Sequence, residues 1–199
     1  MSALLLSLLL FVANAENPFA EPAHVRVLIF ARTDCPITNR YAPELARIAQ
    51  EFSVRDVKFW IVYPDSSETP DKIAKHMADY HLPGHGIPDP HFELRKRAEA
   101  KVSPQAAVFD SNGMLTYSGR IDDRYVAFGK SRPAPDVHDL ENAIQATLSG
   151  KPIAEPRTKA IGCYLDDLNE PQTDCGTLIR RMPKSSRLAV NERATSGVA

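Results

Sequence analysis

The chain has 199 residues, of which 43% are apolar and 25% charged, and its 24 basic side chains nearly balance its 25 acidic ones. This composition is typical of a globular domain and excludes a wholly disordered chain, a collagen-like repeat and a protein with several membrane spans. The formal net charge of −1 leaves no excess of positive charge to neutralise phosphates, so nucleic-acid binding is not expected.

The first 15 residues are typical of an export signal. Residues 4–12 are apolar except for Ser7, and Ala13-Asn14-Ala15 has the small side chains that a signal peptidase accepts. The run is shorter than the roughly 20 residues that span a bilayer as a helix. We therefore interpret 1–15 as a signal peptide and expect an exported chain, periplasmic or extracellular, with no stable membrane span after cleavage; a buried N-terminal strand or helix is the alternative.

A polar leader at 16–24 precedes an alternation of strands and helices. Apolar, β-branched runs at 25–31 and 57–63 predict buried strands. Between them, 36–52 places its apolar side chains three and four residues apart, as on one helical face. Thr69-Pro70 resembles a helix N-cap followed by proline at the first helical position and predicts a helix to Tyr80.

The second half is predicted to contain a hairpin and a last helix. The glycine- and proline-rich residues 82–90 predict a loop, and 91–100 a charged helix. Strands at 106–110 and 114–120 flank a turn at 111–113. A long polar loop at 122–136 is followed by a helix at 137–148.

This order predicts an α/β domain over 25–150, with a mixed β-sheet covered by helices on both faces. Strand, helix and strand imply a parallel crossover, and the hairpin adds antiparallel strands. Residues 151–199 lack periodicity and are expected to form a largely irregular C-terminal extension.

The segment Asp34-Cys35-Pro36-Ile37-Thr38-Asn39-Arg40-Tyr41 carries the clearest chemical signal. Pro36 suits the first position of the helix and makes Cys35 its N-cap, where unpaired N–H groups and the helix dipole favour the reactive thiolate. Arg32 and Arg40 are expected to add to this effect and Asp34 to oppose it.

This segment, Pro43 within the same helix and Val102-Ser103-Pro104 before a strand resemble the thioredoxin-like superfamily, over roughly 25–148. The resemblance implies a thioredoxin-like fold with a cis-proline, Pro104, that faces Cys35 and leaves the Ser103 backbone exposed to an incoming peptide or thiol. The Asp-Cys-Pro-x-x-Asn-Arg-Tyr pattern is similar to exported bacterial redoxins, which are grouped with the alkyl hydroperoxide reductase and thiol-specific antioxidant domain.

Two positions depart from related patterns. Thioredoxins carry a second cysteine where this chain has Thr38, whose hydroxyl is able to hydrogen-bond to the Cys35 sulfur. Typical peroxiredoxins carry proline, and threonine or serine, where this chain has Leu28 and Arg32. A mixed disulfide on Cys35 therefore needs a resolving thiol from outside the motif.

Cys163 and Cys175 are the two other cysteines, and either is a candidate resolving thiol. The alternatives are that Cys163 is a small buried apolar residue and that Cys175 is an incidental thiol in a loose tail.

The resemblance favours a thiol–disulfide oxidoreductase. Cys35, Thr38 and Cys163 are its expected catalytic residues, and Pro36, Ser103 and Pro104 shape the site for a protein or small-molecule thiol or disulfide. A peroxidase in which Cys35 becomes a sulfenic acid is one alternative, and a non-catalytic module that binds copper or a redox partner is the other. The sequence predicts no cofactor and no metal site, and it leaves the oligomeric state open.

Two further groups of residues receive structural interpretations. His81, His85 and His91, with His76 before them, are more simply exposed loop side chains than copper or zinc ligands. Asp122 and Asp123 are interpreted as a surface loop held by arginine pairing, and Phe59 and Trp60 as core.

Overall fold

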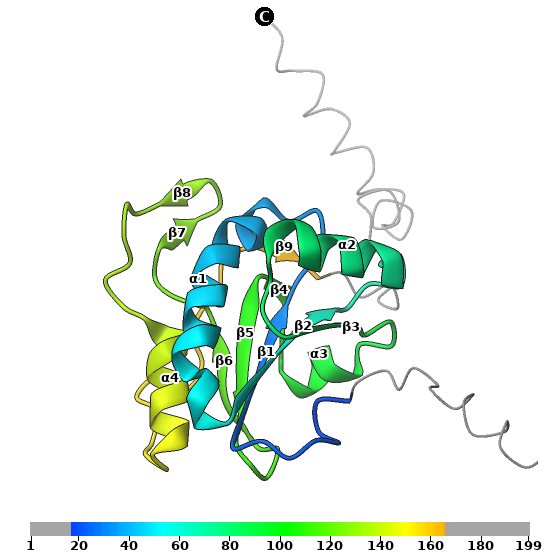
Figure 1. The fold of residues 1–199 in the computed structure, drawn as a ribbon. Coiled ribbons are helices and arrows are strands. Elements are labelled where there is room, and N and C mark those ends of the chain that lie inside the picture. Colours follow the sequence, from blue (N-terminus) through cyan, green and yellow to red (C-terminus); the bar gives the residue numbers. More distant parts are fainter. Residues whose placement is uncertain (1–16, 166–199) are drawn as a thin grey trace, which may run out of the picture. The chain divides into compact units, whose positions relative to one another are not determined.

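The structure, a computed structural model, describes residues 17–165, so the predicted signal peptide and Cys175 lie outside the described part of the chain. Its centre is a five-stranded mixed sheet in the order β3-β2-β1-β5-β6 (Figure 1). β1 is parallel to β2 and antiparallel to β5. The sheet strands are β1 (Val25–Phe30), β2 (Val57–Tyr63), β3 (His85–Pro88), β5 (Gln105–Phe109) and β6 (Leu115–Gly119).

Helices cover both faces of this sheet, as predicted. Alternate residues of β1 point to opposite faces, so Val27 packs in one apolar cluster and Leu28 in the other. The first cluster takes buried side chains from α1 (Pro36–Phe52), α2 (Pro70–Tyr80) and α4 (Asp139–Leu148). α3 (Glu93–Arg97) contributes to the second, and a 3-10 turn, η1 (Ser53–Arg55), follows α1. No helix in residues 17–165 is long and apolar enough to cross a membrane.

The predicted ends of α1, α2 and β2 are confirmed, whereas several short elements differ from the prediction. The expected loop at 82–90 contains β3, which pairs in parallel with β2 at the sheet edge. Four residues that include glycine and proline give little strand signal, and an edge is where a sheet tolerates proline. α3 is shorter than the predicted 91–100 because Phe92 takes a left-handed conformation, with φ 59°, immediately before it.

The predicted loop at 122–136 contains a small hairpin, β7 (Tyr125–Ala127) with β8 (Lys130–Ser131). The surface interpretation of Asp122 and Asp123 is wrong, because these residues are only 2% and 6% exposed. Asp122 accepts a hydrogen bond from the Tyr41 hydroxyl. The Asp123 carboxylate accepts from the Asp136 and Val137 N–H groups, at 2.7 and 3.0 Å, and pairs with Arg132.

Residues 151–165, which we call the strap, return from α4 along β6 toward the start of α1. The Ser118 N–H donates to the Pro156 carbonyl at 3.0 Å, and the Thr158 N–H donates to Ser118 at 3.3 Å. A Cβ at Gly119 would lie 2.1 Å from Thr158 Oγ1, so the missing side chain permits this crossing. The strap ends in β9 (Cys163–Tyr164), which pairs antiparallel with β4 (Val102–Ser103).

Candidate active site

Cys35 is the N-cap of α1, in an extended conformation with φ −82° and ψ 110°, and Pro36 begins the helix. The N-terminal end of the helix therefore faces the cysteine, as the sequence predicts. The Cys35 side chain is completely buried. Its thiol donates a hydrogen bond to the Ser103 carbonyl, with 3.0 Å between sulfur and oxygen.

The Ser103 side chain connects this carbonyl to the loop before the helix. Its hydroxyl accepts a hydrogen bond from the Arg32 N–H at 2.9 Å and lies 2.8 Å from the Thr38 hydroxyl. The Ser103–Pro104 peptide bond is cis. The structure thus brings Cys35, Thr38, Ser103 and Pro104 together from α1 and the β4–β5 junction.

Cys163 completes this group from the strap. It lies opposite Ser103 in the β4–β9 register and packs against the apolar cluster that contains Cys35. Cys163 thus lies beside the residue whose carbonyl accepts the Cys35 thiol, and both cysteines are free thiols. The expectation that the Ser103 backbone is open to an incoming peptide is therefore wrong for this conformation, because the chain's own β9 pairs with it.

The two thiols have pKa values shifted in opposite directions. Burial raises the pKa of Cys35, but hydrogen bonds from the Thr38 N–H and hydroxyl, the Cys163 thiol and Ser103 hold its pKa below the ordinary value. Burial, the hydrogen bond to Cys35 and the Cys35 charge raise the pKa of Cys163 to about 11. The thiolate therefore forms preferentially on Cys35.

The charged side chains beside Cys35 do not act on its thiolate as the sequence analysis predicted. Arg32 pairs with Asp34 through both carboxylate oxygens, at 3.0 Å each, and the Asp34 side chain is 67% exposed. The Arg32 guanidinium holds the pKa of the Asp34 carboxyl below its usual range. Because the two side chains neutralise each other, Cys35 is stabilised as thiolate mainly by hydrogen bonds.

Replacing Thr38 by valine tests this account of the thiolate. The variant keeps the backbone N–H and the side-chain shape but removes a hydroxyl that lowers the pKa of Cys35, so that pKa should rise. The midpoint of the pH profile of Cys35 alkylation, followed by mass spectrometry, then moves to higher pH. Thr116→Val is the control, because that hydroxyl bonds Val108 and Thr147 instead. An unchanged midpoint in Thr38→Val would show that the hydroxyl serves Ser103 alone.

A carboxylate that the sequence analysis missed holds the loop before Cys35. Glu68 is 8% exposed, and its Oε1 accepts hydrogen bonds from the Thr33 N–H at 3.0 Å and the Thr33 hydroxyl at 2.9 Å. Glu68 follows β2 in a stretch whose composition indicates only a turn. No local pattern connects it with Thr33, which is 35 residues away.

His76 also differs from the exposed loop side chains expected for the histidines. It is 4% exposed, with Nδ1 2.7 Å from the Tyr63 hydroxyl and Nε2 2.8 Å from Asn39 Oδ1. Burial lowers its pKa and favours the neutral ring. Its position three residues after buried Ile73 on α2 was the available signal. The other three are exposed, as predicted: His81, His85 and His91.

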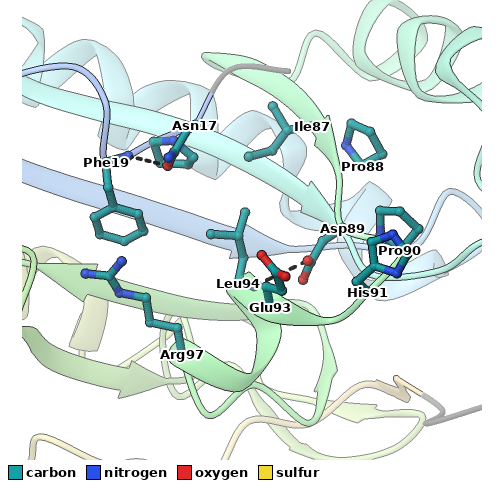
Figure 2. Close-up of a pocket in the computed structure, with 11 residues that line it drawn as sticks. Asn17, Phe19, Ile87, Pro88, Asp89, Pro90, His91, Glu93, Leu94 and Arg97 are labelled. Atoms are coloured by element: carbon teal, nitrogen blue, oxygen red, sulfur yellow. Dashed lines mark hydrogen bonds between the residues drawn. The ribbon is translucent and has the colours of Figure 1, made fainter. Parts of the chain in front are cut away.

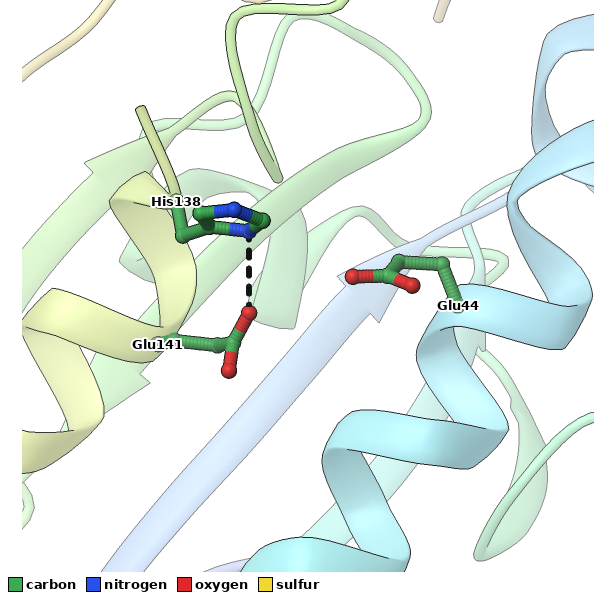
Figure 3. Close-up of side chains that lie close together, drawn as sticks. All are labelled: Glu44, His138 and Glu141. Atoms are coloured by element: carbon green, nitrogen blue, oxygen red, sulfur yellow. Dashed lines mark ion pairs between the residues drawn. The ribbon is translucent and has the colours of Figure 1, made fainter. Parts of the chain in front are cut away.

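Two further features lie apart from the cysteines. Glu44, His138 and Glu141 come close enough to suggest a metal site (Figure 3). Arg47 pairs with both carboxylates, at 2.7 and 2.6 Å, so the cluster is an ion-pair network.

A cavity of about 440 Å³ lies between residues 17–19 and the loop that leads into α3 (Figure 2). Its lining includes Phe19, Asp89 and Arg97, and no cysteine.

Comparisons with known proteins agree with this architecture. A model of the AhpC/TSA family matches residues 19–118, half of the chain, a range that includes Cys35 and Ser103 and ends before Cys163. No curated protein matches the chain significantly.

Solved structures are similar in fold. An uncharacterised conserved protein from Geobacillus kaustophilus is 24% identical with a TM-score of 0.61, over 73% of this chain and 78% of that one. A hypothetical protein from Sinorhizobium meliloti 1021 is 21% identical with a TM-score of 0.62, over 72% and 79% of the two chains. A thioredoxin-like protein solved in its oxidised form is 16% identical with a TM-score of 0.50, over 68% and 86%. These likenesses show a thioredoxin-like fold.

Proposed function

The chain belongs to the AhpC/TSA family, and we propose that it is a thiol–disulfide oxidoreductase in which Cys35 attacks and Cys163 resolves. One observation carries the proposal: Cys163 lies opposite Ser103, whose carbonyl accepts the Cys35 thiol, so both free thiols meet at one residue, and their pKa values are shifted in opposite directions. A low pKa supplies the attacking thiolate, and an adjacent thiol releases the intermediate.

The proposed reaction has two exchange steps. The Cys35 thiolate attacks one sulfur of a disulfide, which forms a mixed disulfide on Cys35 and releases the first partner thiolate. The Cys163 thiol then loses its proton and attacks the Cys35 sulfur, which forms the Cys35–Cys163 disulfide and releases the second thiolate. The partner disulfide gains two electrons and the protein dithiol loses two; an external thiol restores the dithiol.

The mixed disulfide also prepares the second step. In the free enzyme, the Cys35 charge and the hydrogen bond to Cys35 help to raise the pKa of Cys163. Both effects end when Cys35 is bonded to a partner, so the pKa of Cys163 falls. The resolving thiolate therefore becomes available after its target has formed.

The alternatives receive less support from the geometry. Copper binding by thiolate and histidine is disfavoured because His76 is engaged with Tyr63 and Asn39. In a peroxidase, the Cys35 thiolate attacks a hydroperoxide to give a sulfenic acid and an alkoxide, and Cys163 then expels water. This route ends in the same disulfide, but Arg32 stands where typical peroxiredoxins carry threonine or serine.

We also propose that the chain is exported, on the basis of its first 15 residues and of a chemistry that suits an oxidising compartment. An exported product whose N-terminus lies near Glu16 supports this, and an uncleaved chain retained in the cytoplasm contradicts it.

Disulfide mapping tests the function. The reduced chain is treated with a stoichiometric small-molecule disulfide, alkylated and digested, and we expect peptides that link Cys35 to Cys163 and separate in dithiothreitol. A Cys175→Ser variant is the control and should give the same link. A Cys35–Cys175 link, or no intramolecular link with two free thiols, would overturn the proposal.

A further inference from the structure

β9 occupies the edge of β4 that lies beside the reactive sulfur. Ser103 pairs with Cys163 and Val102 with Tyr164, so the chain's own strap fills the place where another extended segment would pair with Ser103. We propose that residues 162–165, Gly-Cys-Tyr-Leu, occupy the docking site of a partner's disulfide-bearing segment, and that this site selects segments of the form glycine, cysteine, any residue, apolar residue. The proposal rests on the proposed function and specifies its partner.

The glycine requirement follows from the close approach of the two backbones. A Cβ at Gly162 would lie 2.1 Å from the Ser103 carbonyl oxygen and 2.6 Å from its carbon. Both are backbone atoms, so no side-chain rotation relieves the clash. A partner segment that lies in the same register therefore needs glycine immediately before its cysteine.

The apolar requirement follows from Leu165, the residue immediately after β9. Leu165 is 3% exposed and packs in the apolar cluster of the second sheet face, which includes Leu28 and Phe30. Its N–H donates to the Lys101 carbonyl at 3.0 Å. Tyr164, which lies between Cys163 and Leu165, is 77% exposed. The residue between the cysteine and the apolar residue of a partner segment is therefore unrestricted.

A protein partner must replace β9 to react. Cys35 is completely buried while β9 is in place, so the sulfur of a protein disulfide has no access to it. The pairing of β9 with β4 is only two residues long, and Arg157 is held to Glu99 by an exposed ion pair. A partner segment therefore displaces β9 and forms the mixed disulfide, and the return of β9 brings Cys163 back as the partner leaves.

The test uses the full chain with Cys163→Ser and Cys175→Ser, so that the reaction stops at the mixed disulfide. The probes are peptides of sequence Ala-Ile-Gly-Cys-Tyr-Leu whose cysteine is coupled to thionitrobenzoate, and absorbance of the released thiolate gives the rate. Matched peptides carry alanine in place of glycine, or serine in place of leucine. Each rate is divided by the rate at which the same peptide disulfide reacts with a small-molecule thiol in place of the protein.

The parent peptide is expected to react about tenfold faster than either matched peptide, because alanine adds a Cβ that clashes with the Ser103 carbonyl and serine removes the apolar contact made by leucine. Equal normalised rates for the three peptides would overturn the inference and leave the function standing. If neither the peptides nor dithiobis(nitrobenzoate) reacts with Cys35 in the folded chain, the proposed function itself is wrong.

Discussion

Replacing Cys163 by serine is expected to stop the reaction after its first step. Cys35 keeps its position at the start of α1, so it still attacks a disulfide, but the mixed disulfide then waits for an external thiol. An adjacent thiol has an effective concentration far above that of a millimolar reductant, and multiple-turnover activity should fall by about a thousandfold. A 1:1 mixed disulfide on Cys35 accumulates and is detected as a mass increase.

Two matched variants make this result specific. Cys35→Ser should abolish both turnover and the mixed disulfide, because it removes the attacking atom. Cys175→Ser should change neither. Undiminished turnover in Cys163→Ser would mean that the released thiols come from a one-thiol reaction or from Cys175, and would remove Cys163 from the mechanism.

The core of the fold was predictable because it depends on local patterns. Apolar spacing on α1 and β-branched runs in β1 and β2 indicate these elements wherever the chain later packs. Pro36 placed Cys35 at the helix N-terminus on the same local grounds. β3 was missed because an edge strand of four residues, with glycine and proline among them, carries neither pattern.

The surroundings of Cys35 were less predictable because they come from distant parts of the chain. Glu68 reaches Thr33 from 35 residues away, and Cys163 reaches Ser103 through the strap, which has no periodicity. The path of the strap has two sequence signals, Gly119 and Gly162, and each is needed where two backbones approach closely. A glycine does not identify its neighbour, so the sequence left Cys163 and Cys175 as alternative resolving thiols.

Gly162→Ala is expected to change the reactions of the two cysteines in opposite directions. The added Cβ would lie 2.1 Å from the Ser103 carbonyl oxygen, so β9 must move away from β4 and carry Cys163 with it. A displacement of about 1 Å is enough to slow formation of the Cys35–Cys163 disulfide by about a hundredfold. The same movement uncovers Cys35, so its alkylation by a bulky maleimide should become faster.

The opposite signs separate displacement of the strap from general destabilisation. Gly150→Ala is the control, because Gly150 also has a positive φ, 61°, yet a Cβ there meets nothing within 4 Å. That variant is strained but leaves β9 in place, so disulfide formation and maleimide alkylation should both stay near the parent rates. If Gly162→Ala forms the disulfide at the parent rate, Cys163 reaches Cys35 without the β4–β9 pairing. The strap then supplies a nearby thiol but does not cover the partner site.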